Sequence, residues 1–300
     1  MTQTAGPNGV SVGNFAAALF LAVMWGVSIP VTKLGLLTIP PLTLTGLRFL
    51  IAVPLMFLLV AGRQGLPLRA FPRVAALGVL GIGIGQVAQS FGVAGTSASI
   101  GTTISAAIPA FVVVFAAIRL RQPVTLIQGI GIVAAFGGIA LVAAGRGDGN
   151  SAATQTSLAG AGLVLLSTLT IAFYYVWSVE LSERYGTVVV AAWSTLFGFL
   201  ALAPFAVWEA LNTPFALTAV GIGSALYLGV MVTVAGLFLW LYLLRTLPAR
   251  VAASVQYLQP IVGVAVSAMM FGDQLGPLFI FGVGLVLTGL TLTVVNKRTA

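Results

Sequence analysis

Few side chains in the sequence can take part in binding or proton transfer, and most of them lie inside long apolar stretches. Gln86, Gln89 and Ser90 are spaced i, i+3 and i+4, which places them on one face of a helix. Glycines at 78, 81 and 85 form a second stripe beside them. A polar side chain in an apolar segment needs a protein partner or a water-filled cavity. The pattern therefore predicts a helix whose polar face lines a cavity and whose glycine face packs closely, unless the amides only bond neighbouring helices.

Two proline-containing segments repeat one layout, with Pro109 in the first and Pro260 in the second. Proline removes a backbone N–H and frees the carbonyl one turn earlier, so each proline marks an expected hinge or kink. A cavity water, a bound solute or a nearby hydroxyl has to satisfy that carbonyl. The residues of these segments that we assign to a binding cavity are Thr102, Ser105, Gln256, Tyr257 and Gln259.

Aromatic side chains supply a third set of candidates. Trp25 lies near the middle of its apolar stretch, with Ser28 three residues later on the same face. An indole can stack on an apolar or aromatic solute while its N–H donates to a polar group. Tyr175 and Trp177 lie in another apolar stretch, and we assign all four residues to the same candidate binding site.

Two cations lie in or beside the apolar stretches. Lys33 is near the end of its stretch and can extend towards water, whereas Arg48 lies deeper. A buried arginine can attract a carboxylate, or it can hold backbone carbonyls where helices meet. Both interpretations of Arg48 stay open at this point.

The sequence contains no Cys and no His. Disulfides, thiolate nucleophiles, imidazole bases and the usual soft metal sites are therefore excluded. We expect no catalytic residue, no metal site and no cofactor, and we do not expect an enzyme. Glycine-rich strings at 78–86 and 129–138 resemble dinucleotide-binding loops. Without a preceding strand, they are better interpreted as helix-packing surfaces.

The amino-acid composition indicates which solvent surrounds the chain. Of the 300 residues, 59% are hydrophobic and 6% are charged, whereas roughly a quarter are charged in a soluble domain. Uncharged stretches of about 20 residues can cross a bilayer core, and without the alternation of barrel strands they must be helices. An all-α membrane protein is therefore predicted. Its ten expected spans are residues 14–36, 41–62, 73–94, 99–118, 125–145, 158–179, 187–209, 216–243, 249–271 and 276–296.

Basic residues concentrate in every second connection between these spans. With the N-terminus placed in the cytoplasm, the outer connections contain only Lys33 and Arg146. The inner segments contain Arg63, Arg69, Arg73, Arg119, Arg121, Arg184, Arg245, Arg250, Lys297 and Arg298. Because bases are retained on the cytoplasmic side, we expect an inner-membrane protein with both termini in the cytoplasm. The net charge of +8 is then a topology signal, and nucleic acid is not an expected partner.

An internal repeat divides the chain. The segment Ser97–Pro109 aligns with Pro248–Pro260 at an offset of 151, and Gly131 and Gly138 keep the same offset to two later glycines. We expect two homologous halves, residues 1–147 and 148–300. Five spans in each half is an odd number, so the halves must have opposite orientations, as in carriers that use alternating access.

The sequence resembles the EamA type of the drug/metabolite transporter superfamily. The resemblance rests on Trp25-Gly26 with Lys33 in the first span, on Arg48 in the second, and on a proline helix followed by a glycine-spaced last helix in each half. It implies two five-helix repeats with both termini in the cytoplasm, and the family's aromatic amino-acid exporters are the first members to compare. One departure is that the acid often found after the proline helix is Gln122 in the first half, where Asp273 stands in the second.

The predicted function is a secondary carrier that exports amino acids, including aromatic and apolar ones, through a lipid bilayer. A monomer is expected, with a dimer left open. Because no acidic residue lies in the middle of a span, we expect facilitated movement or exchange, with proton coupling as the alternative. The second hypothesis is a carrier of drugs, nucleosides or sugars. A channel and an intramembrane lipid enzyme are the remaining alternatives, and the enzyme would need clustered acids or histidines.

Overall fold

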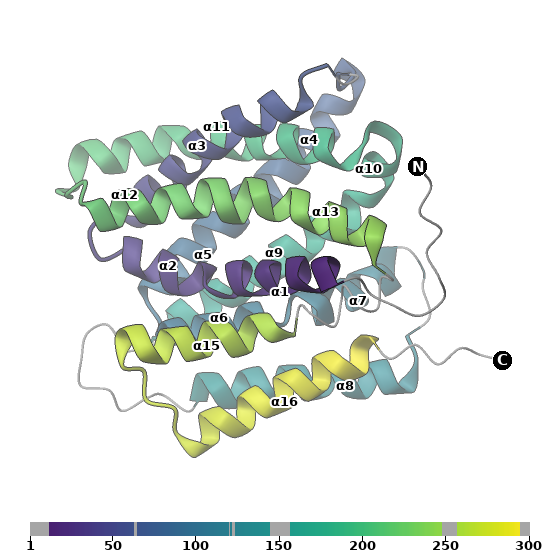
Figure 1. Ribbon diagram of the computed structural model, residues 1–300, viewed down its shortest axis with the longest axis vertical. Helices are drawn as coiled ribbons and strands as arrows, with labels where there is room; N and C mark the ends of the chain where they lie inside the picture. Colours follow the sequence, from purple (N-terminus) through teal and green to yellow (C-terminus); the bar gives the residue numbers. More distant parts are fainter. Residues whose placement is uncertain are drawn as a thin grey trace.

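The computed structural model is a bundle of helices that run across the molecule side by side (Figure 1). It describes residues 12–62, 65–119, 121, 124–144, 157–247 and 257–294. One end of the bundle carries Arg73, Arg119, Arg184 and Arg245, and we call it the basic end. Lys33, Glu209 and Asp273 lie at the other end, which we call the capped end. Helix α1 begins and helix α16 ends at the basic end (Figure 1).

The helical elements follow one another with short connections. In chain order they are α1 (Val12–Gly26), α2 (Ser28–Gly35), α3 (Pro41–Val60), η1 (Leu68–Ala70), α4 (Phe71–Leu77), η2 (Gly78–Gly83), α5 (Ile84–Ala94), α6 (Ala98–Ser105), α7 (Ile108–Arg119), α8 (Leu126–Ala144), α9 (Leu158–Trp177), α10 (Val179–Tyr185), α11 (Thr187–Asn212), α12 (Ala219–Leu226), η3 (Tyr227–Ala235), α13 (Gly236–Thr246), α15 (Leu258–Phe271) and α16 (Pro277–Val294). Elements η2 and η3 are π-helical.

These elements form the predicted membrane spans. Eight continuous helical stretches of the described chain are long and apolar enough to cross a membrane, and two shorter apolar helices, Leu258–Phe271 and Pro277–Thr293, follow them. The third span begins at Leu68, five residues before the predicted start, because a 3₁₀ turn extends it. Large apolar side chains such as Leu58, Leu126 and Met269 are 71–85% exposed, as expected for a surface that faces lipid. The predicted fold class, an all-α membrane protein, is confirmed.

The two halves repeat each other helix by helix at the offset of 151. The break at Val27 between α1 and α2 corresponds to the break at Ser178 between α9 and α10. The π-helical η2 corresponds to residues 229–234, which lie inside the π-helical η3. Helices α8 and α16 also begin 151 residues apart. The repeat seen in a few glycines and prolines therefore extends to irregularities of the backbone.

Helices α8 and α16, the last of each half, pack along each other at the lower edge of the bundle in Figure 1. Gly131 lies against Gly289, and Gly138 lies against Gly282. The 151-residue offset exchanges these two contacts, so the pseudo-two-fold axis passes between α8 and α16. Glycine at each crossing lets the backbones approach closely, which is how helices associate in lipid.

The glycine stripe of the third span is also a packing face, as the sequence predicts. A Cβ atom on Gly78 would clash with the backbone of Ser194 in α11. Gly81 and Gly85 lie against Tyr174 and Thr170 of α9. Span three is therefore held between two helices of the second half, and its polar residues point elsewhere.

The glycine pair at 137 and 138 gives a matched test of the α8–α16 interface. A methyl group at Gly138 would stand 2.5 Å from the carbonyl oxygen of Gly282, whereas one at Gly137 would meet nothing within 4 Å. We expect Gly138→Ala to lower stability by about 1–3 kcal/mol through overpacking, and Gly137→Ala to leave it unchanged. Thermal unfolding of both purified variants in detergent measures this. Equal unfolding temperatures would show that the interface is not as close as described.

Candidate functional site

Arg48 of α3 joins three helical spans near the middle of the bundle. Its Nη1 donates to Gln86 Oε1 of α5 at 2.6 Å, and its Nε donates to Thr233 Oγ1 of η3 at 3.0 Å. Helices α3 and α5 belong to the first half, and η3 belongs to the second. The arginine is therefore shared between the halves at the level where a carrier would hold its solute.

The π-helical geometry of η3 explains how this site is built. A π-helix shifts hydrogen bonding to residues five apart and often occurs at functional positions. Here Thr233 Oγ1 donates to Leu228 O, five residues earlier, at 2.8 Å while it accepts from Arg48. The carbonyl oxygen of the preceding residue, Val232, accepts the indole N–H of Trp25 at 3.1 Å. The π-helical segment thus binds two side chains of the first half, Trp25 through a backbone carbonyl and Arg48 through the Thr233 hydroxyl.

Tyr175 of α9 completes this group. Its hydroxyl interacts electrostatically with the Arg48 guanidinium, yet 49% of the residue is exposed. Half of this tyrosine therefore stays accessible beside the central arginine. Arg48, Gln86 and Thr233 are each half-buried, so packing does not fully enclose any of the four residues. We call Arg48, Gln86, Tyr175 and Thr233 the central polar cluster.

The structure places the other predicted residues of spans one and three mostly in packing contacts. The Trp25 ring lies 6.1 Å from that of Trp240, and Ser28 Oγ donates to Trp25 O. Ser90 Oγ lies 2.6 Å from Thr45 Oγ1 of α3. Gln89 is half-buried beside them and has no hydrogen-bond partner within the described chain.

The proline segments behave as breaks in their helices. Pro109 is the second residue of α7, directly after the turn that separates α7 from α6. Pro260 is the third residue of α15. Gln256 lies outside the described residues. Both prolines therefore lie in the first turn of a helix, the position at which proline is tolerated.

The polar residues near these prolines have different surroundings. Thr102 Oγ1 donates to Ala98 O within α6. Ser105 Oγ is buried without a partner among the described residues. Tyr257 Oη donates to Leu290 O at 3.0 Å. Gln259 is half-buried, and its backbone lies against Gly26 of α1. Of this set, Ser105 presents a fully buried polar atom without a partner among the described residues.

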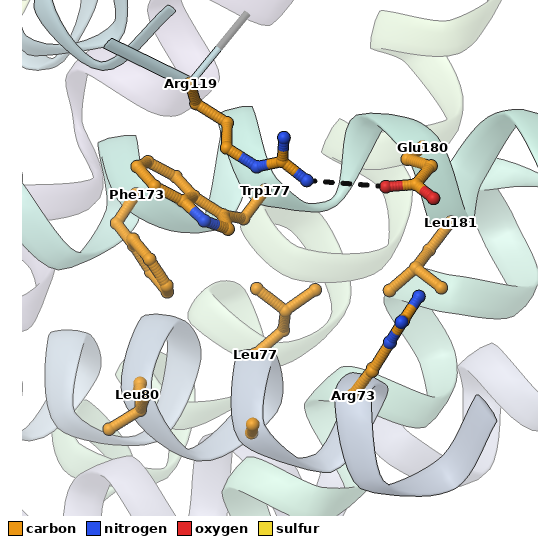
Figure 2. Close-up of a pocket in the computed structure, with 9 residues that line it drawn as sticks. Arg73, Leu77, Leu80, Arg119, Phe173, Trp177, Glu180 and Leu181 are labelled. Atoms are coloured by element: carbon orange, nitrogen blue, oxygen red, sulfur yellow. Dashed lines mark ion pairs between the residues drawn. The ribbon is translucent and has the colours of Figure 1, made fainter. Parts of the chain in front are cut away.

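Trp177 lines a cavity of about 520 Å³ at the basic end. Figure 2 shows Phe173 and Trp177 of α9 facing Leu77 and Leu80, with Arg119 and Glu180 above them. The Arg119–Glu180 ion pair at 3.5 Å is 48% and 69% exposed, so it adds little stability. Arg73, Ala76 and Leu181 complete the lining. We call this space the basic-end cavity.

The corresponding region at the capped end is closed. The positions 151 residues from Arg73, Leu77 and Phe173 are Ser224, Leu228 and Ala22. All three are at most 3% exposed. Tyr227 Oη also donates to Met24 O at 2.8 Å, which ties η3 to α1. Equivalent surfaces of the inverted repeat are thus open at one end and packed at the other.

Trp177 and its counterpart Gly26 show the same difference. Trp177 stacks on Phe173 at 4.5 Å and leaves a cavity beside it. At Gly26, a Cβ atom would be 2.8 Å from the carbonyl oxygen of Gln259. The glycine lets α1 and α15 touch at this point, whereas the equivalent position of the other half carries an indole.

The capped end is held together by three charged side chains, those of Lys33, Glu209 and Asp273. Their positions in the sequence did not predict this role. Lys33 Nζ donates to the carbonyls of Val93, Ala94 and Thr96 at 2.8–3.1 Å, at the end of α5. Glu209 Oε2 accepts the N–H and the hydroxyl of Thr43 at 2.7 and 2.8 Å. A lysine at a helix C-terminus and an acid at an N-terminus match the helix dipole.

Asp273 makes a similar contact between the halves. Its Oδ2 accepts the Ser99 N–H at 2.9 Å, in the first turn of α6. Lys33 also attracts this carboxylate. Asp273 and Glu209 both belong to the second half, and both accept N–H groups at helix starts of the first half. In the sequence, the signal for these two contacts was an acidic residue at the end of one span, on the same side of the membrane as the start of another span.

An inverted helix repeat with a polar centre and a cavity at the basic end is the architecture of a membrane carrier. Comparison with known families agrees: the model of the EamA-like transporter family matches residues 13–144 and 158–295. The chain therefore belongs to the EamA-like transporter family. It is a transporter and not an enzyme, as expected from the sequence.

Curated relatives of similar length align over nearly the whole chain. The "Uncharacterized inner membrane transporter YedA" of Escherichia coli strain K12 is 26% identical over 94% of this chain and 91% of its own length. The "Probable terminal-alkyne amino-acid exporter" of Streptantibioticus cattleyicolor is 28% identical over 94% and 93%. The "Probable amino-acid metabolite efflux pump" of Salmonella typhimurium is 27% identical over 94% of both chains. A solved structure, 16% identical with a TM-score of 0.64 over 93% of this chain and 96% of its own, shares the fold.

Glu209 offers a test of the capped end. Glu209→Ala leaves the N–H and hydroxyl of Thr43 without their acceptor, so we expect a loss of about 1–3 kcal/mol of stability. Glu183→Ala is the control, because Glu183 is exposed at the basic end. Thermal unfolding in detergent compares the two, and an equal loss in both variants would rule out a special role for Glu209.

Proposed function

We propose that this protein exports amino acids, including aromatic and apolar ones, by alternating access. The difference between the two ends of the repeat carries this proposal. A carrier of inverted repeats has two forms in which the halves exchange arrangements, and one end opens as the other closes. The basic-end cavity and the closed region around Ser224 and Leu228 correspond to one such form.

The distribution of charges supports the proposed orientation of the chain in the membrane. Bases are retained in the cytoplasm, so the basic-end cavity opens to the cytoplasm and both termini lie there. In this form the carrier accepts solute from inside the cell. Movement of residues 1–147 against 148–300 would then close the cavity and open the capped end, where Lys33, Glu209 and Asp273 make their contacts.

The amino-acid cargo is supported by the relatives and by the lining. Two relatives carry names of amino-acid or amino-acid metabolite exporters. The cavity walls combine aromatic and aliphatic side chains with the charged groups of Arg73, Arg119 and Glu180, which suits a small solute that has both an apolar side chain and charged groups. Trp177 from the predicted site lines the cavity, and Gln86 and Tyr175 belong to the central polar cluster. One chain contains both halves of the repeat, so a monomer suffices.

Exchange or facilitated movement fits the position of the acids. Glu180, Glu183, Glu209 and Asp273 all lie at ends of described spans or just outside them. A proton-coupled carrier commonly uses a titrating group at membrane depth. The gradient of the amino acid itself is therefore the proposed driving force.

Reconstituted vesicles test the cargo and the coupling. We expect saturable uptake of labelled phenylalanine that is accelerated when the vesicles are preloaded with unlabelled phenylalanine or leucine, because a carrier reorients faster with solute bound. Nucleosides and sugars should not compete. Non-saturable flux without counterflow would indicate a channel, and uphill accumulation driven by an imposed pH gradient would refute the uncoupled mechanism.

Cysteine accessibility tests the two ends, because the sequence has no native cysteine. Ala76→Cys lies in the basic-end cavity, and Ser224→Cys replaces a residue that is 3% exposed at the capped end. A membrane-impermeant thiol reagent should label Ala76→Cys in inside-out vesicles only. It should label Ser224→Cys from outside only when amino acid drives exchange. Rapid external labelling of Ser224→Cys without solute would contradict the closed capped end.

A further inference from the structure

Arg48 is a cation in the middle of the bundle without an acidic neighbour among the described residues. Its two hydrogen-bond acceptors, Gln86 Oε1 and Thr233 Oγ1, are neutral. The acids of the described chain lie at the span ends, where Glu180 pairs with Arg119 and Glu209 and Asp273 accept helix N–H groups. A charge in a low-dielectric interior is costly without an opposite charge. The central polar cluster therefore carries a positive charge that a bound anion would neutralise.

The geometry leaves donors available for such an anion. A guanidinium has five N–H donors, and the described contacts use one on Nε and one on Nη1. Arg48 is only half-buried, and Tyr175 beside it is 49% exposed, so packing leaves both residues partly accessible. Gln86 and Thr233 hold the guanidinium from two sides and fix its plane. A planar fork of this kind matches the two oxygens of a carboxylate.

We infer that Arg48 binds the carboxylate group of the transported solute, with Gln86 and Thr233 as positioning residues and the Tyr175 hydroxyl as a flanking donor. The inference deepens the proposed function by naming the recognised group. It also sets specificity, because the same cluster repels organic cations and offers no acid to an isolated amine. The position 151 residues from Arg48 is Phe199, so the carrier has one such site and not two.

A purely structural role is the competing explanation, in which Arg48 only ties α3 to α5 and η3. The two roles separate when Arg48 receives a carboxylate from the protein itself. Gln86→Glu keeps the size and the accepting oxygen of Gln86 while it adds the missing charge. A tie between helices would be kept or strengthened by this ion pair, whereas a solute site would be occupied by it.

The first arm of the experiment compares solutes on the wild-type protein. Binding is followed in detergent by intrinsic tryptophan fluorescence and by thermal shift, so that it does not depend on transport. We expect phenylalanine and phenylpropionate to bind, and phenylalanine amide and phenethylamine to bind about tenfold more weakly or worse, because they lack the carboxylate. Equal binding of the amide and amine would overturn the inference.

The second arm compares Gln86→Glu and Arg48→Gln with Arg245→Gln, an exposed arginine at the end of α13. We expect at least about tenfold weaker binding of phenylalanine in both cluster variants, with Gln86→Glu as heat-stable as the wild type. Arg245→Gln should bind normally. If Arg48→Gln does not fold, Gln86→Glu still decides, and wild-type affinity in Gln86→Glu would leave Arg48 with a structural role only.

The outcomes also separate this inference from the proposed cargo. If amino acids bind but do not exchange in vesicles, the transport proposal fails and the Arg48 site stands. If vesicles exchange phenylalanine while the amide competes equally and Gln86→Glu is unaffected, the amino-acid carrier stands and the Arg48 site fails. If only phenylpropionate and similar acids bind, the recognised group is right and the amino-acid cargo is wrong.

Discussion

Every backbone N–H and C=O group in the bilayer core must find a partner inside the protein, and the structure depends on this constraint. Regular helices meet it without help, so most of the chain consists of helices with apolar surfaces. The informative places are those where the helix is irregular or ends. There, a side chain from another element has to supply the missing partner.

Each such place in this protein joins two parts that would otherwise be independent. The π-helical η3 offers Val232 O to Trp25 and Leu228 O to Thr233, which in turn holds Arg48. At the capped end, Lys33 donates to the last carbonyls of α5, and Glu209 and Asp273 accept N–H groups at the starts of α3 and α6. The same requirement that forces helices therefore also positions the central polar cluster and closes one end.

The sequence predicted the large-scale features well, because hydropathy and charge report directly on the bilayer. The ten spans follow from long apolar runs, and the glycine string at 129–138 predicted a packing surface without its partner, which the structure shows to be α16. The details of the site were harder to predict. Gln86 and Ser90 do share a face, but that face lies along α3, where it meets Arg48 and Thr45. Spacing along one helix fixes a direction only relative to that helix, and the neighbour in that direction comes from the fold.

Residues whose partners are backbone atoms of distant elements could not be assigned from spacing. Lys33 appeared able to extend to water, yet its ammonium is buried against three carbonyls of another span. Nothing in the local sequence marks the end of α5 as its neighbour. The π-helical segments are equally hidden, since their residues are as apolar as those of ordinary spans. Their recurrence at an offset of 151 becomes visible only once both are described.

The backbone of this carrier repeats between the halves, but its side chains do not. In the proposed mechanism, this difference sets the direction of transport. The backbone repeats at 151, so either end can in principle open. The side chains do not repeat, because Glu209 corresponds to Leu58 and Arg48 corresponds to Phe199. A leucine cannot accept a backbone N–H group as Glu209 accepts that of Thr43, so the described part of the basic end has no counterpart of that contact. In the proposed mechanism, the repeated backbone supplies alternation, while the unrepeated charges favour a closed capped end and select the recognised group.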